Sequence, residues 1–432
     1  MTDTHSPRLT LVEIISLGVG TMIGAGIFAL FGSISTLAGG YAWMAFAVSA
    51  IVSASAGYGY SVLARTASTN GGIAEYLDIG FDGNLIGRAI AFCYFLSIAV
   101  VLGLVAKSFG HYTVKVLSLG HGTVLWFGVG VMLVFLLINA LGLRLLGLSE
   151  KLMVGAKLIV LVGFTIVTFT RFDAATYGQN AASVAFNAGN FVNAVALANL
   201  SFAGFAVIAN AGGSTKQGQG TIGRAIFIAI ALVAVVYISL DIAVFGSIGL
   251  SRIEAARDYA LAEAATPVLG QAGFLLLGIT AMVSTATNIN ANIFSASNTI
   301  SYMARTRALS PILSRHIFLR QGNIAMIVTV VIVIVMLVTL NLEQIGDVAS
   351  LTFLLVHTFV PLGAARHVAR GEVTGSRALL WFGVLINAGV MVFFAWHLIG
   401  TGTLELYVLA GLIAFAVAFC AISKAMIGPK DA

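Results

Sequence analysis

Hydrophobic and polar residues follow one another along this chain in long blocks rather than in alternation. The apolar blocks have about the 20 residues that an α-helix needs to cross a bilayer, and short polar or charged segments separate them. Twelve such blocks are predicted, at residues 12–32, 41–64, 87–107, 124–143, 150–170, 191–214, 225–249, 269–303, 324–341, 346–366, 378–398 and 404–423. The pattern therefore predicts an all-α polytopic membrane protein with twelve transmembrane helices.

The composition supports the same class. Of the 432 residues, 59% are hydrophobic and 9% are charged, and the mean hydropathy is +1.03, which is far above that of water-soluble domains. The polar start MTDTHSPRLT leads into the first apolar block without a small-residue cleavage site, so we expect the first helix to remain in the mature chain. Cys93 and Cys420 both lie inside apolar blocks and are interpreted as small hydrophobic residues, not as a disulfide.

The net charge of +6 comes from basic residues spread over short loops, which favours a membrane protein over a nucleic-acid-binding one. If the chain starts inside, sixteen lysines and arginines fall in cytoplasmic segments and five in outer segments, while Lys157 lies within the fifth block. This bias follows the positive-inside rule. We therefore expect an integral protein of the cell (inner) membrane with both termini in the cytoplasm.

The first apolar block contains the stretch GVGTMIGAGIF, which has four glycines between Gly18 and Phe28. One interpretation is close helix packing, since Gly20 and Gly24 form a small-xxx-small pair. A dinucleotide site is excluded, because no strand precedes the stretch and the glycine spacing is wrong. The other interpretation is a helix break near residues 23–26. Non-helical backbone is tolerated in a bilayer only where protein shields it or where it lines a cavity, so a break implies a site.

The sixth block offers a counterpart, NLSFAGFAVIANAGGSTK, which includes Ser201, Gly204, Asn210, Gly212 and Gly213. Broken helices in corresponding positions of two halves are typical of transporters built from inverted repeats. We therefore expect one membrane domain in three parts: a first five-helix repeat at 1–170, a second, inverted repeat at 187–368, and two peripheral helices at 377–427.

Four stretches resemble motifs of one family in the expected order: GTMIGAGIF in the first block, TASTNGGIAEYL after the second, SFAGF in the sixth, and SYMARTRALSP after the eighth. On these stretches the chain resembles the amino acid–polyamine–organocation (APC) superfamily of amino acid transporters. The resemblance implies a LeuT-type fold, with ten core helices in two inverted repeats and two peripheral helices. It implies no cofactor.

The two breaks suit the backbone of an amino acid. A half-helix that begins near Gly26 points free N–H groups and a positive dipole end at a carboxylate, and one that ends near Phe202 presents carbonyls to an ammonium. In the resembling family the same segments hold these groups. The resemblance thus implies substrate-binding roles for Thr21, Ile23, Gly24, Ala25, Gly26, Phe202, Ala203 and Gly204. It also implies that Phe205 caps the substrate, although a packing role for this phenylalanine is the alternative.

Lys157 lies about one and a half turns into the fifth block, where a mid-helix lysine costs roughly 2.5–3.5 kcal/mol. Snorkelling to the inner surface is one interpretation. The resemblance implies another, in which the ammonium replaces the ion of sodium-coupled relatives, between the first break and span 8. Such a lysine can gain and lose a proton during transport. Its expected neighbours are Ser284 and Thr287.

Other polar residues in the apolar blocks have weaker interpretations. Asp241 is either a proton relay or a group that reaches the interface, and His357 and His397 are interpreted as core or interfacial histidines rather than switches. Asn288, Asn290, Asn292 and Asn298 recur on nearly one face of span 8, which indicates interhelical hydrogen bonds or a wet cavity wall.

The chain departs from the family pattern at several positions: Ala206 where many members have an acid, Gly212 and Gly213 at an acidic pair, Asn298 at an arginine, and Arg305-Thr306-Arg307 at an Arg-Asp-Gly turn. If the missing acid and arginine are normally partners, both are lost together. The inner gate is therefore expected to close differently, and this weakens the coupling that the resemblance implies.

No acid lies between Arg88 and Lys107 in span 3 to pair with a cationic side chain, so we expect a neutral substrate. The chain is predicted to be a secondary active transporter of neutral amino acids that works by alternating access, with proton coupling through Lys157. An exchanger, or a carrier of an amine or an inorganic cation, is the alternative. No spacing of metal ligands, intramembrane acid pair or pore ring indicates an enzyme, a metal site or a channel.

Overall fold

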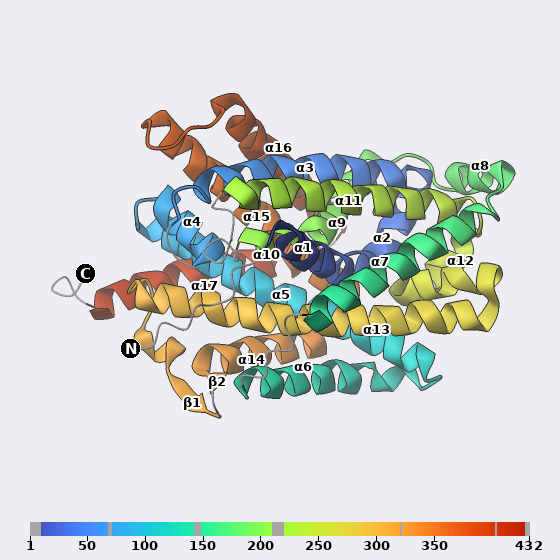
Figure 1. Cartoon of the computed structure of the whole chain (residues 1–432), viewed down its shortest axis with the longest axis horizontal. Coiled ribbons are helices and arrows are strands. Elements are labelled where there is room, and N and C mark those ends of the chain that lie inside the picture. The colour runs from blue at the N-terminus through green and yellow to red at the C-terminus, as the bar shows by residue number, and fades with distance from the viewer. Residues whose placement is uncertain are drawn as a thin grey trace.

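The structure is a computed structural model that describes residues 10–67, 71–141, 148–209, 220–319, 322–401 and 404–427. Within these ranges the chain is almost entirely helical, with one antiparallel β-hairpin. The long helices lie roughly side by side in one bundle (Figure 1). The predicted all-α class is confirmed.

The first half of the chain forms α1 (Leu11–Ala25), α2 (Ile27–Ala38), η1 (Gly39–Tyr41), α3 (Ala42–Leu63), α4 (Gly72–Gly80), α5 (Leu85–Val116), η2 (His121–Thr123), α6 (Val124–Ala140), α7 (Leu148–Phe169) and α8 (Ala174–Ser183). The second half forms α9 (Ala188–Phe202), α10 (Phe205–Ala209), α11 (Gly220–Phe245), α12 (Leu250–Ala255), η4 (Arg257–Tyr259), α13 (Ala260–Arg305), η5 (Pro311–Ser314), β1 (His316–Phe318), β2 (Gly322–Asn323), α14 (Ile324–Thr339), α15 (Leu342–Ala369), α16 (Arg377–Thr401) and α17 (Leu404–Ile427).

Nine helical segments in the described ranges are long and apolar enough to cross a membrane. Three further apolar helices are shorter, at Leu11–Gly24, Val124–Ala140 and Ile324–Thr339. The chain is therefore a polytopic membrane protein. The count of twelve spans and the division into two repeats and a peripheral pair stay predictions.

Asparagine side chains fix where four of the long helices begin. Each accepts a hydrogen bond from the backbone N–H three residues further on, which satisfies a donor that the helix itself cannot pair. These residues are Asn84 before α5, Asn187 before α9, Asn323 before α14 and Asn341 before α15. Because these caps are polar, α5, α9 and α15 begin up to about a turn before the apolar blocks that predicted them, whereas α14 begins where its block does.

Helix α13 is longer than its predicted span, 269–303, because a helical segment precedes a kink. Gly270, at the kink, has φ 65° and ψ −158°, a conformation that favours glycine, and Pro267 lies just before it. The segment before the kink follows α12 and η4 at one end of the bundle, on the right in Figure 1. We call this end the α12 end, and the opposite end, which carries the β-hairpin, the hairpin end.

Helix α15 is tied at the α12 end by an ion pair. Arg257 of η4 contacts Glu343 at the start of α15, with 2.7 Å between Nη2 and Oε1. Its Nε also donates to the hydroxyl of Ser33 on α2, at 3.0 Å. One guanidinium therefore joins η4, α2 and α15.

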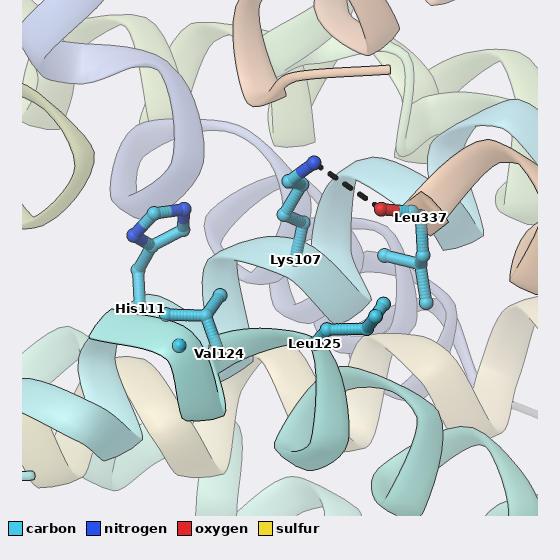
Figure 2. A pocket seen from close by; sticks show the side chains of 6 residues that line it. Lys107, His111, Val124, Leu125 and Leu337 are labelled. Carbon is cyan, nitrogen blue, oxygen red and sulfur yellow. Dashed lines mark hydrogen bonds between the residues drawn. The ribbon is translucent and has the colours of Figure 1, made fainter. Parts of the chain in front are cut away.

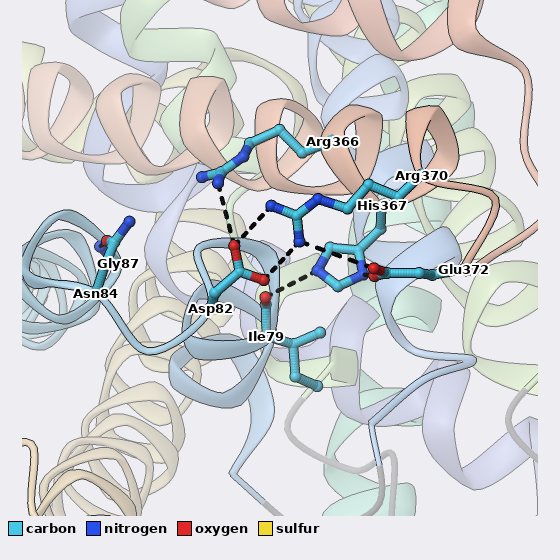
Figure 3. A network of polar contacts seen from close by, with 8 residues as sticks. All are labelled: Ile79, Asp82, Asn84, Gly87, Arg366, His367, Arg370 and Glu372. Atoms are coloured by element: carbon cyan, nitrogen blue, oxygen red, sulfur yellow. Dashed lines mark hydrogen bonds and ion pairs between the residues drawn. The ribbon is translucent and has the colours of Figure 1, made fainter.

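At the hairpin end, Asp82 ties the turn between α4 and α5 to the end of α15 (Figure 3). Its carboxylate accepts two hydrogen bonds from Arg370, at 2.7 and 2.8 Å, and one from Arg366 at 3.1 Å. Next to this cluster, His367 contacts the Ile79 carbonyl at 2.9 Å and the Glu372 carboxylate. The Arg370 hydrogen bond is the main reason why the pKa of the Asp82 carboxyl is lowered.

A lowered pKa makes the Asp82 contribution to stability depend on pH. A carboxylate with a depressed folded-state pKa stabilises the fold above its unfolded pKa of about 4, and this contribution is lost as the pH falls through the folded value. We expect Asp82→Asn to lower the melting temperature in detergent at pH 7, and the difference from wild type to shrink as the pH falls below about 4. Glu254→Gln, at an exposed carboxylate of α12, is the control; a difference for Asp82→Asn that is independent of pH would contradict the assignment.

Candidate functional site

The first helix break lies at Gly26, between α1 and α2, within the segment 23–26 that the sequence predicts. Gly26 donates to the Met22 carbonyl at 2.9 Å, and Leu30 donates to the Gly26 carbonyl at 3.0 Å. The Gly26 backbone, with φ −84° and ψ −79°, departs from ideal helix geometry, and α2 begins anew at Ile27. The first N–H groups of a helix have no partner within it, so the start of α2 is a place where a ligand can find donors. One of them, the Ile27 N–H, contacts the Tyr237 hydroxyl.

The second break lies at Ala203 and Gly204, between α9 and α10, also where the sequence predicts it. Ala206 donates to the Ala203 carbonyl at 3.0 Å, and Val207 donates to the Gly204 carbonyl at 3.1 Å. The last carbonyls of α9 are left without helical partners, as at any helix C-terminus. The two breaks thus present complementary polar groups, donors from α2 and acceptors from α9.

The two broken helices are in direct backbone contact. A Cβ on Gly26 would lie 2.6 Å from the Cα of Ser201 on α9. A Cβ on Gly204 would overlap the Met22 nitrogen on α1 and lie 2.9 Å from the Met22 Cα. Only glycine permits these approaches, so the predicted substrate-binding segments are brought together by their glycines.

Two other helices hydrogen-bond to the carbonyls in the last turn of α1. Asn288 of α13 donates to the Thr21 carbonyl at 2.9 Å, and Tyr237 of α11 donates to the Met22 carbonyl at 2.9 Å. Interhelical bonding by the span-8 asparagines was one of two predicted roles, and Asn288 makes such a bond. Tyr237 was missed, because nothing in its spacing distinguishes it from the other tyrosines of the chain.

Lys157 of α7 is buried, with 3% of its surface exposed, and its ammonium donates to the Thr287 hydroxyl on α13 at 2.5 Å. Thr287 in turn donates to the Ser284 carbonyl at 2.9 Å. A Cβ on Gly24 would lie 2.6 Å from this same carbonyl, so the contacts lead from Lys157 to α1 beside the first break. A snorkelling lysine would extend to the surface instead, so this geometry favours the buried alternative.

Ser284, the other predicted neighbour of Lys157, is fully buried, and its hydroxyl has no hydrogen-bond partner among the described residues. The remaining predicted side chains are also buried, and the Thr21 hydroxyl donates to Leu17 of its own helix at 2.8 Å. The Ala25 side chain, Asn210, Gly212 and Gly213 lie outside the described part of the chain. Asn298 is exposed, unlike the other span-8 asparagines, and Asp241 is buried rather than at the interface.

Phe205, the first residue of α10, belongs to a buried cluster of rings. It stacks on His357 of α15, with 5.0 Å between ring centroids, and meets Tyr60 of α3 edge-on at 5.3 Å. All three side chains are fully buried. The predicted capping residue therefore packs against two polar rings that were not predicted to belong to the site.

A surface cavity of about 260 Å³ lies elsewhere, between α5, α6 and α14 (Figure 2). It is lined by Lys107, His111, Gly122, Val124, Leu125 and Leu337, none of which is a predicted site residue. Lys107 donates to the carbonyls of Leu337, at 3.4 Å, and Leu340. A cation at this place offsets the negative end of α14, so we assign Lys107 a structural role.

Comparisons with known proteins find a family and several similar chains. Residues 9–422 match the family described as Amino acid permease. The inner membrane transport protein YbaT of Escherichia coli (strain K12) is 31% identical over 419 residues, which is 96% of each chain. An uncharacterised protein of Methanocaldococcus jannaschii is 26% identical over 397 residues, covering 91% of this chain and 90% of its own. The serine/threonine exchanger SteT of Bacillus subtilis is 23% identical over 379 residues, 84% of each chain.

The contact at the first break can be tested with a single methyl group. Gly26 has φ −84°, which alanine adopts readily, so any cost of Gly26→Ala arises from the clash with Ser201. We expect the variant to insert but to be less stable by about 1–3 kcal/mol, measured by thermal unfolding in detergent. Gly163→Ala is the matched control, since no atom lies within 4 Å of the added methyl. Equal stability of the two variants would show that the breaks do not touch.

Proposed function

Because the chain belongs to the amino acid permease family of the APC superfamily, we propose that it is a secondary active transporter that moves neutral amino acids by alternating access. It is an integral membrane transporter and not an enzyme. The name of YbaT supports an inner-membrane location for this chain as well. The orientation with both termini in the cytoplasm is part of the proposal.

The observation that carries this proposal is the contact between the two helix breaks. The start of α2 offers N–H donors and a positive dipole end to a carboxylate, and the end of α9 offers carbonyls to an ammonium. The backbones meet at Gly26 and Gly204, so both half-helices reach the same small region. A zwitterion presents one group of each kind, and it can therefore use both ends at once.

Two features support a neutral side chain. Helix α5 has no carboxylate between Arg88 and Lys107, and the rings around Phe205 are those of a tyrosine and a histidine. A charged side chain enclosed there would lack a counterion, which is costly in a low dielectric.

Proton coupling through Lys157 is the finer part of the proposal. The ammonium is linked through Thr287 and the Ser284 carbonyl to the packing surface of Gly24. Loss of its proton would remove a charged donor from this chain of contacts. Protonation of Lys157 can thereby alter the contact between α13 and α1 beside the first break. Coupled transport requires such a link between the bound proton and the substrate-binding segment.

Exchange of one amino acid for another is the second candidate, because a relative at 23% identity is named a serine/threonine exchanger. A carrier of another small solute, such as an amine or an inorganic cation, would use the carbonyls of α9 but not the donors of α2. Substrate competition and the pH dependence of uptake separate these functions.

The carboxylate is the feature that distinguishes an amino acid from an amine. We expect the purified protein in liposomes to take up at least one neutral amino acid, and the methyl ester of that substrate to compete at least about tenfold less well, because it lacks the charge that the start of α2 attracts. Competition by the ester as strong as by the parent amino acid would remove the argument from the helix dipole.

The coupling role is tested by Lys157→Met, which keeps most of the length of the side chain and removes its charge. A pH gradient, acid outside, should accelerate uptake by the wild type without sodium, and the variant should lose this acceleration while it retains exchange of substrate. Lys424→Met, at an exposed lysine near the end of α17, is the control. A pH profile of Lys157→Met that matches wild type would rule out Lys157 as the proton carrier.

A further inference from the structure

His357 lies within α15 with its side chain fully buried, and neither of its ring nitrogens has a hydrogen-bond partner among the described residues. Leaving such a group unpaired costs about 1–3 kcal/mol for each atom. A buried histidine normally has a partner for at least one nitrogen. This position therefore indicates that something other than the surrounding protein pairs with the imidazole.

Tyr60 of α3 shows the same anomaly next to His357. Its ring lies 5.9 Å from that of His357, it is fully buried, and its hydroxyl is likewise unpaired within the described ranges. Tyr76, which meets Tyr60 edge-on at 6.3 Å, provides a contrast, because its hydroxyl donates to the Ala209 carbonyl at 3.2 Å. Tyr76 shows that a buried hydroxyl in this region can find a partner within the protein, whereas the Tyr60 hydroxyl and the His357 nitrogens find none in the described part of the chain.

The pair lies beside the second helix break. Phe205 follows Gly204 directly, and its ring contacts both Tyr60 and His357. The fourth ring of the group, Phe353, meets His357 edge-on at 5.6 Å. The unpaired polar atoms are therefore one ring away from the second break, where the α9 carbonyls are proposed to hold the amino group.

We propose that Tyr60 and His357 form a subsite that hydrogen-bonds the side chain of the substrate, so that the transported amino acids are neutral ones with a hydroxyl or carboxamide group. This inference rests on the proposed function. A neutral imidazole offers one donor and one acceptor, and a phenol offers both on one oxygen. A hydroxyl or carboxamide is complementary to both, whereas an aliphatic side chain leaves them unpaired and a charged one finds no counterion among the aromatic neighbours.

The test uses ligand pairs of equal shape. Thermal stabilisation of the purified full-length chain is titrated with threonine against valine and with asparagine against leucine. A site built around a hydrogen bond penalises the analogue that lacks it, so we expect the wild type to bind threonine and asparagine at least about tenfold more tightly than their apolar partners.

Two variants identify the residues responsible. In His357→Leu and Tyr60→Phe the preference for threonine over valine should fall by about tenfold, while stability without ligand stays equal to that of wild type or rises, because an unpaired buried polar group is removed. Tyr76→Phe is the matched control: it removes a hydroxyl that has a partner, so it should lower stability and leave the preference unchanged.

The outcomes separate the two proposals. Equal binding of threonine and valine by the wild type, or an unchanged preference in both variants, would overturn the subsite while the transport function stands. Loss of stability in both variants without ligand, with preference retained, would show that the two rings only support the fold, and would also overturn it. Binding of amines or cations but of no neutral amino acid would overturn the proposed function and the subsite together.

Discussion

The structure depends on one constraint, which is that a backbone N–H or C=O group without a partner cannot face lipid. Both α1 and α9 end in mid-bundle, and each break is covered by the other chain segment: Gly26 lies against Ser201, and Gly204 lies against Met22. Helices α11 and α13 complete the cover through Tyr237 and Asn288. The close packing that shields the backbone at the two breaks from lipid also holds their polar helix ends close together. The same contacts therefore protect the breaks and form the candidate site.

Much of the helical bundle could be predicted because repeated apolar blocks of membrane length are typical of polytopic membrane proteins and rare in water-soluble ones. The helix breaks were predictable for a related reason, since glycine clusters within an apolar block conflict with an unbroken helix. The exact starts of α5, α9 and α15 were not, because their hydrophilic asparagine caps and the polar residues of their first turns fall outside the apolar blocks. The segment of α13 before Gly270 was missed because the block pattern does not reveal a kink within a continuous helix.

For the candidate site, the sequence predicts residues of α1 and α9, and these stay a prediction; what packs on them could not be predicted. Lys157 drew attention because an isolated lysine in an apolar block is costly, and its contact with Thr287 agrees with the neighbour that the family resemblance implied. Tyr60, Tyr237 and His357 come from three further helices, and their proximity to the breaks is set by tertiary packing alone. A single tyrosine or histidine in an apolar helix carries no signal of that kind, and its unpaired atoms can be recognised only when its neighbours are known.

Helix α15 is tied to the rest of the bundle near both of its ends, by Glu343 to Arg257 at the α12 end and by Arg366 and Arg370 to Asp82 at the hairpin end. The two attachments are about 40 Å apart along the helix axis. Both consist of partly exposed ion pairs, which hold far less tightly than buried apolar contacts of the same extent. Exposed ion pairs of this kind are each worth little, so they orient the two ends of α15 while the apolar contacts of its largely buried middle hold the helix in the bundle.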